Sequence, residues 1–291
     1  MELNLERLKR MNKADLYLRL TLMDILKNGQ IDEKPRPKYL DGSPAHSKFI
    51  TQTFEKYDIL NGDTVIPTLR NTAIKAGIKE VLWIYQDASN SLETARERGI
   101  NWWDEWDVGD DTIGMAYGAV VERYNLMGDM LQGMLKNKES RRHILNLYQH
   151  QTAKEQDGLG GLNPCFFMTM WTIRPNNVID VTLFSRSSDF ILAGFINRVQ
   201  YLALAQMVAS HLSFHTGEEY KIGSFAIFTQ NAHMYLRHEA GVRELLDRTP
   251  MDVETKLELN VIKDFYDITL EDFKITCPKI EKLKSELEIA I

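Results

Sequence analysis

The 291-residue sequence has little cysteine, no long apolar run and no strong excess of charge of either sign. Its two cysteines, Cys165 and Cys277, are too few for the disulfide framework of a small secreted protein and fit a reducing cytosol. The longest apolar runs fall far short of the ~20 residues that span a bilayer. The charged start, Met1 to Arg7, is unlike a signal peptide. We therefore expect a soluble, cytoplasmic protein.

The charge balance excludes a general attraction to polyanions. The chain has 35 Lys and Arg against 41 Asp and Glu, a formal net charge of −6. Nothing global draws such a chain to nucleic acid or to an anionic membrane, so an anionic ligand has to be met by a local group of basic residues. The sequence also lacks low-complexity tracts, internal repeats and linkers rich in Pro, Gly or Ser. We expect residues 1–291 to form a single domain.

Apolar periodicity predicts an α+β fold. Helical spacing predicts helices over Lys13–Lys27, Thr72–Gln86, Val120–Leu135 and Asn197–Leu212, the last apolar almost all round. Runs of β-branched and aromatic residues predict strands over Ile144–Tyr148, Phe166–Arg174, Val178–Phe184 and Phe225–Thr229, with a hairpin turn at Pro175–Asn177. Several strands carry large apolar residues on both faces. This favours a sheet with helices on one face and a second sheet, in the same or another subunit, on the other.

One cysteine stands where a thiol could be reactive. Cys165 follows a glycine-rich stretch and Pro164, at the entrance to a predicted strand. A free cysteine is more often a small buried hydrophobe, and a nucleophile needs positive charge nearby to lower its pKa. The segments Ser185–Asp189 and Ser140–His143, together with Arg36, offer arginines and hydroxyls suited to a phosphate. Each could equally be ordinary solvated charge.

Other residues also allow two interpretations. Glu80 interrupts an apolar helix face, either at its solvent edge or buried with the raised pKa that a general acid or base requires. The Trp102, Trp103 and Trp106 cluster suits either core packing or stacking on a flat heterocycle. His233 and Tyr235 share one face of a strand and suit either a sugar hydroxyl or structural hydrogen bonds. The histidines and cysteines show no zinc-like spacing, and no glycine-rich phosphate loop is present.

Taken in order, short motifs along nearly the whole chain resemble the thymidylate synthase family. They are Asp41–His46, Lys79–Trp83, Trp103–Trp106, Gly114–Gly118, Ser140–Arg142, Asn163–Cys165, Arg186–Asp189, Asn197, His233–Tyr235 and Asp264–Asp267. The likeness is greatest to the enzymes of low-GC Gram-positive bacteria and their phages. It implies a large mixed β-sheet that is covered by helices on one face and packs against the partner subunit's sheet on the other.

The resemblance implies reductive methylation of dUMP to dTMP. Cys165 would attack C6 of the uracil ring, and 5,10-methylenetetrahydrofolate would be the co-substrate that donates the one-carbon unit and the hydride, with no metal. Such covalent catalysis divides one hard substitution into easier steps. Glu80 would organise proton transfers, Tyr117 would assist removal of the C5 proton, and Asp189 would bind the pterin.

The same resemblance implies the remaining site residues. Arg36, Arg186 and Ser187 would bind the 5′-phosphate with Arg141 and Arg142 of the partner subunit, which makes the protein a homodimer and gives a field that favours the Cys165 thiolate. Asn197 would bind the pyrimidine edge, and His233 and Tyr235 the ribose hydroxyl. The folate pocket would be formed by Trp103, Trp106, Leu162, Asp189 and the C-terminal Ile291, which closes over the site.

Some positions depart from the family pattern and leave alternatives open. Phe166 replaces a common histidine, Asn163 a proline, Ser185 a glutamine, and Gln230–Asn231 a Gly-Asp pair. These changes fall around the pyrimidine and folate, so a dUMP 5-hydroxymethylase, which traps the same intermediate with water, is the alternative activity. A catalytically silent nucleotide-binding or RNA-binding relative is a third hypothesis. The retention of Cys165 and Glu80 argues against it.

Overall fold

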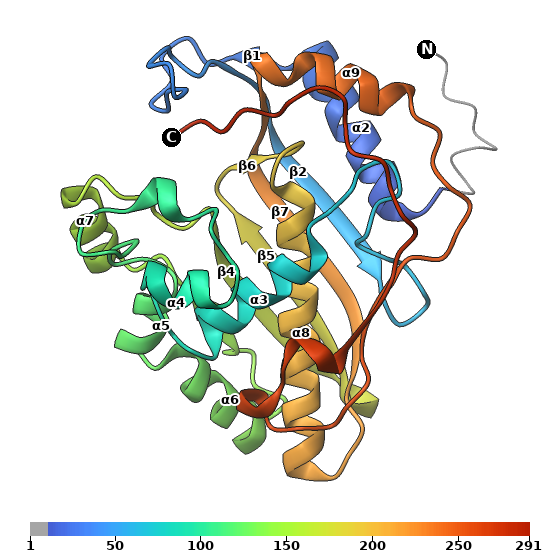
Figure 1. Cartoon of the computed structure of the whole chain (residues 1–291). Coiled ribbons are helices and arrows are strands. Elements are labelled where there is room, and N and C mark those ends of the chain that lie inside the picture. The colour runs from blue at the N-terminus through green and yellow to red at the C-terminus, as the bar shows by residue number, and fades with distance from the viewer. Residues whose placement is uncertain (1–10) are drawn as a thin grey trace.

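The computed structural model describes residues 11–291, which build one large mixed sheet of seven strands (Figure 1). The strand order is β1-β2-β7-β5-β4-β3, and the short β6 also pairs with β7. The β5–β7 and β6–β7 pairs are parallel and the others antiparallel. The strands are β1 (Gln30–Ile31), β2 (Ser47–Asp58), β3 (Ile144–Asn146), β4 (Phe166–Arg174), β5 (Val178–Ser185), β6 (Ser188–Asp189) and β7 (Lys221–Tyr235). The predicted α+β class is confirmed.

Several helices pack against this sheet. The α-helices are α2 (Lys13–Asn28), α3 (Ile74–Tyr85), α4 (Leu92–Glu97), α5 (Gly118–Arg123), α6 (Leu126–Lys136), α7 (His150–Gly158), α8 (Gly194–Thr216) and α9 (Glu239–Asp247). Single turns of 3₁₀-helix are η1 (Asp104–Trp106), η2 (Pro175–Asn177), η3 (Leu236–His238), η4 (Phe265–Asp267) and η5 (Leu270–Asp272). A two-stranded sheet pairs β8 (Lys256–Leu259) with β9 (Phe273–Thr276). Within residues 11–291, no helix combines the length and apolarity that crossing a membrane requires.

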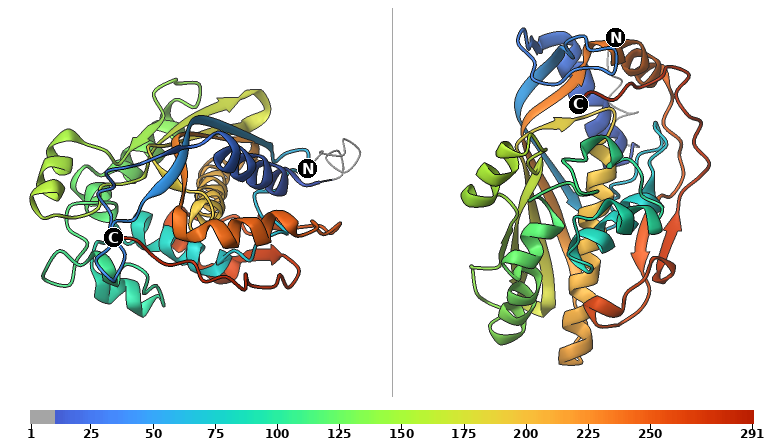
Figure 2. Two further views of the ribbon diagram at one scale, coloured as in Figure 1. Left: turned by 90° about the horizontal axis from the view of Figure 1, so that it is seen from above. Right: turned by 60° about the vertical axis from the view of Figure 1, so that its left-hand side comes forward.

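Helix α8 is the centre of the core. It is the crossover between the parallel strands β5 and β7, and it packs against the sheet, α3, α6 and β8 (Figures 1 and 2). Its apolar residues face neighbours on every side, so nearly all of its positions from Gly194 to Ser213 are buried. A helix of this composition is stable only inside a protein. The helix ends at Gly217, whose φ of +71° is the left-handed conformation that favours glycine.

Most predicted elements are confirmed, and their bounds differ in two informative places. The helix predicted over Val120–Leu135 is broken into α5 and α6, because Asn125 adopts a left-handed φ of +46° between them. The strand predicted over Phe225–Thr229 is the middle of the longer β7. The two ends of β7 contain more polar residues than its middle, so the apolar pattern reveals only the middle. Pro175–Asn177 forms the predicted turn between β4 and β5, with both asparagines at positive φ. Strand β2 has no counterpart among the predicted strands.

The face of the sheet away from α8 carries a row of apolar side chains. Phe54 of β2 pairs with Phe228 of β7, which pairs with Phe184 of β5, which pairs with Met168 of β4. Phe54 is 58% exposed and the other three are half-buried. The structure thus leaves an apolar strip on the face where the sequence predicted a second sheet.

The C-terminal tail lies against the loop between β1 and β2. The backbones of Lys38 and Ile291 exchange two hydrogen bonds, and Tyr39 and Ala290 form a β-bridge. Three residues before the end of the tail, Glu288 forms an ion pair with Arg237. Figure 1 shows the C-terminus beside the loop that follows β1. The end of the chain therefore lies beside the loop that carries Arg36.

Candidate active site

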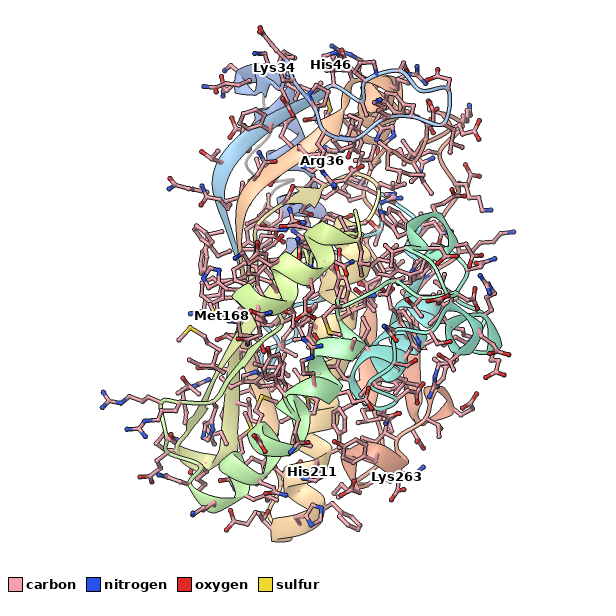
Figure 3. The ribbon with its side chains drawn as sticks, turned by 90° about the vertical axis from the view of Figure 1, so that its left-hand side faces the viewer. Lys34, Arg36, His46, Met168, His211 and Lys263 are labelled. Atoms are coloured by element: carbon pink, nitrogen blue, oxygen red, sulfur yellow. The ribbon has the colours of Figure 1, made fainter. Side chains whose placement is uncertain are left out.

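A cavity of about 910 Å³ opens between the sheet, α3, α8 and the C-terminal tail. Most of the residues predicted to act in the site line this cavity. They are Arg36, Glu80, Trp103, Trp106, Tyr117, Leu162, Cys165, Arg186, Ser187, Asp189, Asn197, His233, Tyr235 and Ile291. Residues from both ends of the sequence are thus brought to one place. Figure 3 labels Arg36 in the upper part of the molecule, below Lys34 and His46.

Cys165 lies at the entrance to β4, half-buried, as the sequence predicted. Its backbone N–H donates to the Tyr117 hydroxyl over 3.3 Å, and its carbonyl accepts from the Arg186 N–H over 2.9 Å. Burial raises the pKa of the thiol, and the positive charges of Arg186 and Arg36 act against this increase. Two of the four predicted arginines therefore act on the thiol. In the single chain burial has the larger effect on the thiol pKa, and the expected contribution of Arg141 and Arg142 from a partner subunit stays a prediction.

Arg186 holds the loop that precedes Cys165. Its Nε donates to the Pro164 carbonyl over 3.0 Å, and its Nη2 donates to the Asn163 carbonyl over 2.7 Å. These two bonds use only part of the guanidinium, which has five N–H donors. The side chain can therefore hold the loop before Cys165 and still offer donors to an anion in the cavity.

Glu80 is buried, not at the solvent edge of α3. Its Oε1 accepts from Trp103 Nε1 over 2.9 Å and its Oε2 accepts from Gln200 Nε2 over 2.7 Å. Gln200 Oε1 in turn accepts from Asn197 Nδ2 over 2.7 Å. Burial raises the pKa of Glu80 to about 7, although the hydrogen bonds from Trp103 and Gln200 oppose the increase. A carboxyl with this pKa can both donate and accept a proton at neutral pH.

Tyr117 adopts a backbone conformation that side chains rarely tolerate. Its φ is +48° and its ψ −110°, just before α5 begins. Such strain persists only where surrounding contacts impose it, and it is common in functional sites. The phenol is buried beside Trp103, with ring centroids 5.1 Å apart, and burial raises its pKa well above the usual value. The strained backbone places a neutral hydroxyl beside Cys165.

His233 and Tyr235 share one face of β7, as predicted, while Met234 between them is fully buried on the other face. His233 Nδ1 lies 3.1 Å from Asn231 Oδ1 and 3.4 Å from Ser187 Oγ. Since an amide oxygen only accepts, Nδ1 carries the proton and Nε2 is free to accept from a ligand. Burial lowers the pKa of His233, which keeps the ring neutral.

Asp189 ends β6 with its two carboxylate oxygens in different environments. Oδ1 accepts from the backbone N–H groups of Ile191 and Leu192, at 3.2 and 3.0 Å. Oδ2 is buried and has no hydrogen-bond partner among residues 11–291; His238 Nδ1 lies 3.6 Å away. A buried polar atom without a partner is costly, so this oxygen is suited to an N–H donor from a ligand.

Arg141 and Arg142 are the two predicted site residues that the chain does not bring to this cavity. Both are exposed, and Arg142 lines a separate cavity beside α6. Conversely, the cavity has further lining residues that the sequence analysis does not identify. Among them are Arg70, Gln200 and Tyr201. Gln200 is detectable in principle as a lone amide in an apolar helix. Tyr201, whose hydroxyl donates to the Phe166 carbonyl over 3.1 Å, looks like any buried aromatic.

The comparisons with known proteins agree with this geometry. The thymidylate synthase family model matches residues 15–286. Thymidylate synthases of Lactococcus lactis and Streptococcus pneumoniae are each 40% identical over 288 residues, covering 97% of this chain and 100% of those proteins. The solved structure of thermostable thymidylate synthase A from Bacillus subtilis superposes with a TM-score of 0.85 at 30% identity, covering 96% of this chain and 99% of that one.

The predicted likeness to enzymes of low-GC Gram-positive bacteria is confirmed, and the hydroxymethylase alternative is not favoured, because these relatives are named thymidylate synthases. The match spans nearly all of the chain and the cavity that holds Cys165. The chain belongs to the thymidylate synthase family.

Proposed function

We propose that this chain methylates dUMP to dTMP, with 5,10-methylenetetrahydrofolate as the donor of the one-carbon unit and the hydride. The observation that carries the proposal is the placement of Cys165 in one cavity with the Glu80–Gln200–Asn197 network. A protein that only binds a nucleotide or RNA has no need of a thiol in the same cavity as a buried carboxyl whose pKa is about 7.

The nucleotide is held so that its C6 meets the thiol. Asn197 Nδ2 has two hydrogens, one of which Gln200 accepts. The other can donate to O4 of uracil while Oδ1 accepts from N3–H. Cys165 then adds to C6 through its thiolate, and Glu80 exchanges a proton at O4 as charge develops there. Because Glu80 has a pKa of about 7, this exchange requires little free energy in either direction.

The phosphate and the sugar lie at the opposite end of the nucleotide. Arg36 and Arg186 supply guanidinium donors and Ser187 a hydroxyl, all lining the cavity. His233 accepts from the ribose 3′-hydroxyl through Nε2, which its contact with Asn231 leaves free, and Tyr235 adds its own hydroxyl. Arginine pairs bidentately with phosphate, which fixes the orientation as well as the affinity.

The remaining part of the cavity fits a reduced folate. Trp103 and Trp106 present aromatic surface, with ring centroids 5.5 Å apart, and Leu162 and Ile291 add apolar surface. The partnerless Oδ2 of Asp189 is suited to the N–H groups of a pterin ring. Trp103 and the C-terminal tail shield the reacting carbon from water, which favours methylation over hydroxymethylation. We assign no metal to the reaction.

We further propose that residues 1–291 act as one catalytic domain and that the active unit is a homodimer. The apolar row of Phe54, Phe228, Phe184 and Met168 supports an interface on the open face of the sheet, since an exposed apolar patch of this kind usually marks a contact surface. Arg141 and Arg142 would then complete the phosphate site of the partner subunit.

Subunit complementation tests the shared site. Chains with Cys165→Ala are mixed with chains carrying both Arg141→Ala and Arg142→Ala, and the mixture is dissociated and reassembled. If the arginines act across the interface, each hybrid dimer has one intact site, with the thiol from one chain and the arginines from the other. Its activity should approach half of that of the unmodified dimer. If the arginines serve their own subunit, the hybrid has no intact site and stays as inactive as the two variant homodimers.

A second hybrid gives the opposite pattern and serves as the control. It joins a chain with all three substitutions to an unmodified chain. If the arginines act across the interface, this hybrid has no intact site, because the only thiol faces a partner without the arginines. Half of the normal activity in this hybrid would show instead that each subunit completes its own site.

The products test the reaction. Protein, dUMP and 5,10-methylenetetrahydrofolate are incubated, and both products are identified by mass spectrometry and by the absorbance of dihydrofolate. We expect dTMP and dihydrofolate in equal amounts. Release of 5-hydroxymethyl-dUMP with tetrahydrofolate would instead assign the chain the hydroxymethylase reaction.

A further inference from the structure

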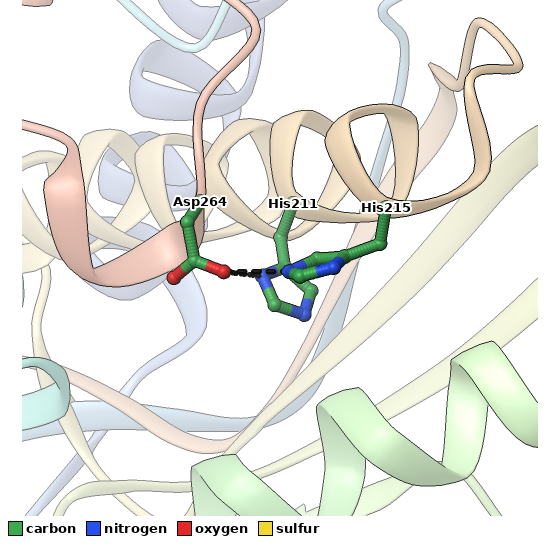
Figure 4. Close-up of side chains that lie close together, drawn as sticks. All are labelled: His211, His215 and Asp264. Atoms are coloured by element: carbon green, nitrogen blue, oxygen red, sulfur yellow. Dashed lines mark hydrogen bonds and ion pairs between the residues drawn. The ribbon is translucent and has the colours of Figure 1, made fainter.

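Two histidines and an aspartate converge at the end of α8 that lies away from the active site (Figure 4). His211 and His215 are one helical turn apart, and Asp264 comes from the segment just before η4. Asp264 Oδ2 lies 2.6 Å from His215 Nε2 and 3.1 Å from His211 Nδ1. One potential ligand atom from each residue lies within 4.8 Å of the others. No part of the proposed reaction uses these residues.

The hydrogen bonds around His211 conflict with one another. Its Nδ1 lies 3.2 Å from the backbone N–H of Phe265, which can only donate, and 3.1 Å from the carboxylate of Asp264, which only accepts. A neutral imidazole nitrogen satisfies one of these neighbours and not the other. A cation between the two rings and the carboxylate would resolve the contact with Asp264, at the cost of the Phe265 hydrogen bond.

The carboxylate is oriented before any ion arrives. Asp264 Oδ1 accepts from the Tyr266 N–H over 3.0 Å, which turns Oδ2 toward the histidines. The neighbouring Lys263 is tied to α8 by its N–H, which donates to Ser210 Oγ over 2.9 Å, and its ammonium is paired with Asp272. The segment and helix are therefore joined independently of the histidines. Hydrogen bonds of this kind orient the ligands of protein metal sites.

The three side chains are of the kinds that bind zinc. Two imidazoles at positions i and i+4 with one carboxylate are ligands that zinc prefers. On a tetrahedral ion with bonds of about 2.0–2.1 Å, ligand atoms lie roughly 3.3 Å apart, so small rotations of these side chains suffice. His215 is exposed, which gives the ion access, and His211 is buried, which fixes one ligand. The site also lies near the C-terminal end of α8, where the helix dipole favours a cation.

We propose that His211, His215 and Asp264 form a site for a divalent transition-metal ion of the zinc class, with water in the remaining position. The ion would fasten the C-terminal end of α8 to the segment around Asp264. Asn197 and His211 are both on α8, roughly 21 Å apart along its axis. Figure 3 places His211 and Arg36 at opposite ends of the molecule. The site is therefore independent of the proposed catalysis.

Cobalt spectroscopy tests the site without reference to activity. Metal-free protein with Cys165→Ala is titrated with Co²⁺, and then Zn²⁺ is added, with binding followed by visible absorption and by calorimetry. The Cys165→Ala background removes one of the two thiols that would otherwise compete for the metal, and binding at the other, Cys277, would be recognised by its thiolate charge-transfer band. We expect one ion per chain, d–d bands of a nitrogen and oxygen site without a thiolate charge-transfer band, displacement by Zn²⁺ and a higher Tm with metal.

Three variants separate metal binding from simple hydrogen bonding. His215→Gln keeps a donor toward Asp264 but loses the imidazole, and Asp264→Asn keeps the acceptor for Tyr266 but loses the charge. Both should abolish the saturable Co²⁺ signal while the metal-free proteins retain a native fold by circular dichroism. His150→Gln, at an exposed histidine elsewhere, should bind as before. No saturable binding in the parent, or equal binding in parent and His215→Gln, would overturn the proposal.

Discussion

The backbones of Lys38 and Ile291 exchange two hydrogen bonds, with N···O distances of 2.7 and 2.9 Å. Ile291 is thereby joined to the loop that carries Arg36, so the tail and one of the arginines proposed to bind the phosphate are positioned together. A change at the C-terminus should therefore alter both the part of the cavity proposed to bind the phosphate and the part proposed to bind the folate.

Deletion of Ile291 should therefore lower kcat by roughly 100-fold, because closure of the site and the position of Arg36 are both lost. Binding of dUMP, measured by calorimetry, should weaken less than kcat falls. Leu40→Ala is the matched control, since Leu40 lies in the same loop and is 72% exposed. An Ile291 deletion with unchanged kcat would show that the tail does not close the site.

Replacement of Cys165 by alanine should abolish turnover, because no other thiol lines the cavity among the described residues. Binding of dUMP should remain, since the Arg36, Arg186 and Asn197 contacts do not involve sulfur. Calorimetry measures the binding and product analysis the turnover. Measurable dTMP formation by Cys165→Ala would exclude the covalent mechanism.

The pH dependence of kcat/KM should show a limb near pH 7, where Glu80 of the ligand-free protein changes its protonation state. In Glu80→Gln this limb should be absent and kcat/KM roughly 10²- to 10⁴-fold lower, the usual contribution of a general acid or base. The profile is measured from about pH 5.5 to 9, a range that brackets this pKa, with dUMP well below its KM so that kcat/KM is obtained. Persistence of the limb in Glu80→Gln would assign it to another group.

Glu80 should also make the folded state less stable as the pH rises. Its folded-state pKa of about 7 lies above the ordinary 4.5, so protonation of Glu80 contributes stability that is complete below about pH 4.5 and is lost as pH rises through about 7. The upper limit of this loss is roughly 3 kcal/mol. Denaturant unfolding at about pH 6 and about pH 8 should show a larger decrease for the unmodified protein than for Glu80→Gln.

Asn197→Asp should move the base preference from dUMP toward dCMP by at least about tenfold in the ratio of kcat/KM values, since a carboxylate accepts from the amino group of cytosine but cannot donate to O4 of uracil. Overall turnover should decrease, because the introduced carboxylate would no longer donate to Gln200. Both nucleotides are assayed side by side. Better use of dCMP by the unmodified protein would contradict the assigned role of Asn197.

Asn231→Ala should raise the KM for dUMP about tenfold with little change in kcat, because His233 loses the acceptor that fixes its Nδ1 proton. Gln230→Ala is a close control, since Gln230 is the exposed neighbour on the same strand. Steady-state kinetics at several dUMP concentrations separate the two parameters. Equal KM values for the two variants would remove Asn231 from the sugar site.

The sequence predicts the regular elements best where burial dominates. It predicts strand β4 over its full length and α8 as a core helix, because continuous apolar residues leave few alternatives. It does not predict strand β2, since most residues of this strand are half-buried or exposed and no alternation stands out. The pairing of β2 with β7 is a tertiary contact that a local pattern does not contain.

In the candidate site, too, residues in local motifs are predictable from the sequence and residues that depend on distant contacts are not. Cys165, Arg186 and His233 belong to short local motifs, so the family resemblance identifies them. Gln200 is not identified, because its role depends on Glu80, 120 positions earlier in the chain. The cluster of His211, His215 and Asp264 is not identified for a similar reason, since Asp264 is 49 residues from His215.

Arg186 donates two hydrogen bonds to the loop carbonyls before Cys165. These bonds link the phosphate of the substrate to the rate of the reaction at Cys165. A phosphate that pairs with this guanidinium also stiffens the segment that aims the sulfur, so binding energy from a remote, unreacting group is used at the reacting carbon. Deoxyuridine, which lacks the phosphate, should therefore be a slow substrate even at saturation. Added inorganic phosphate should restore part of the missing rate, because the two pieces together make the contacts of the whole nucleotide.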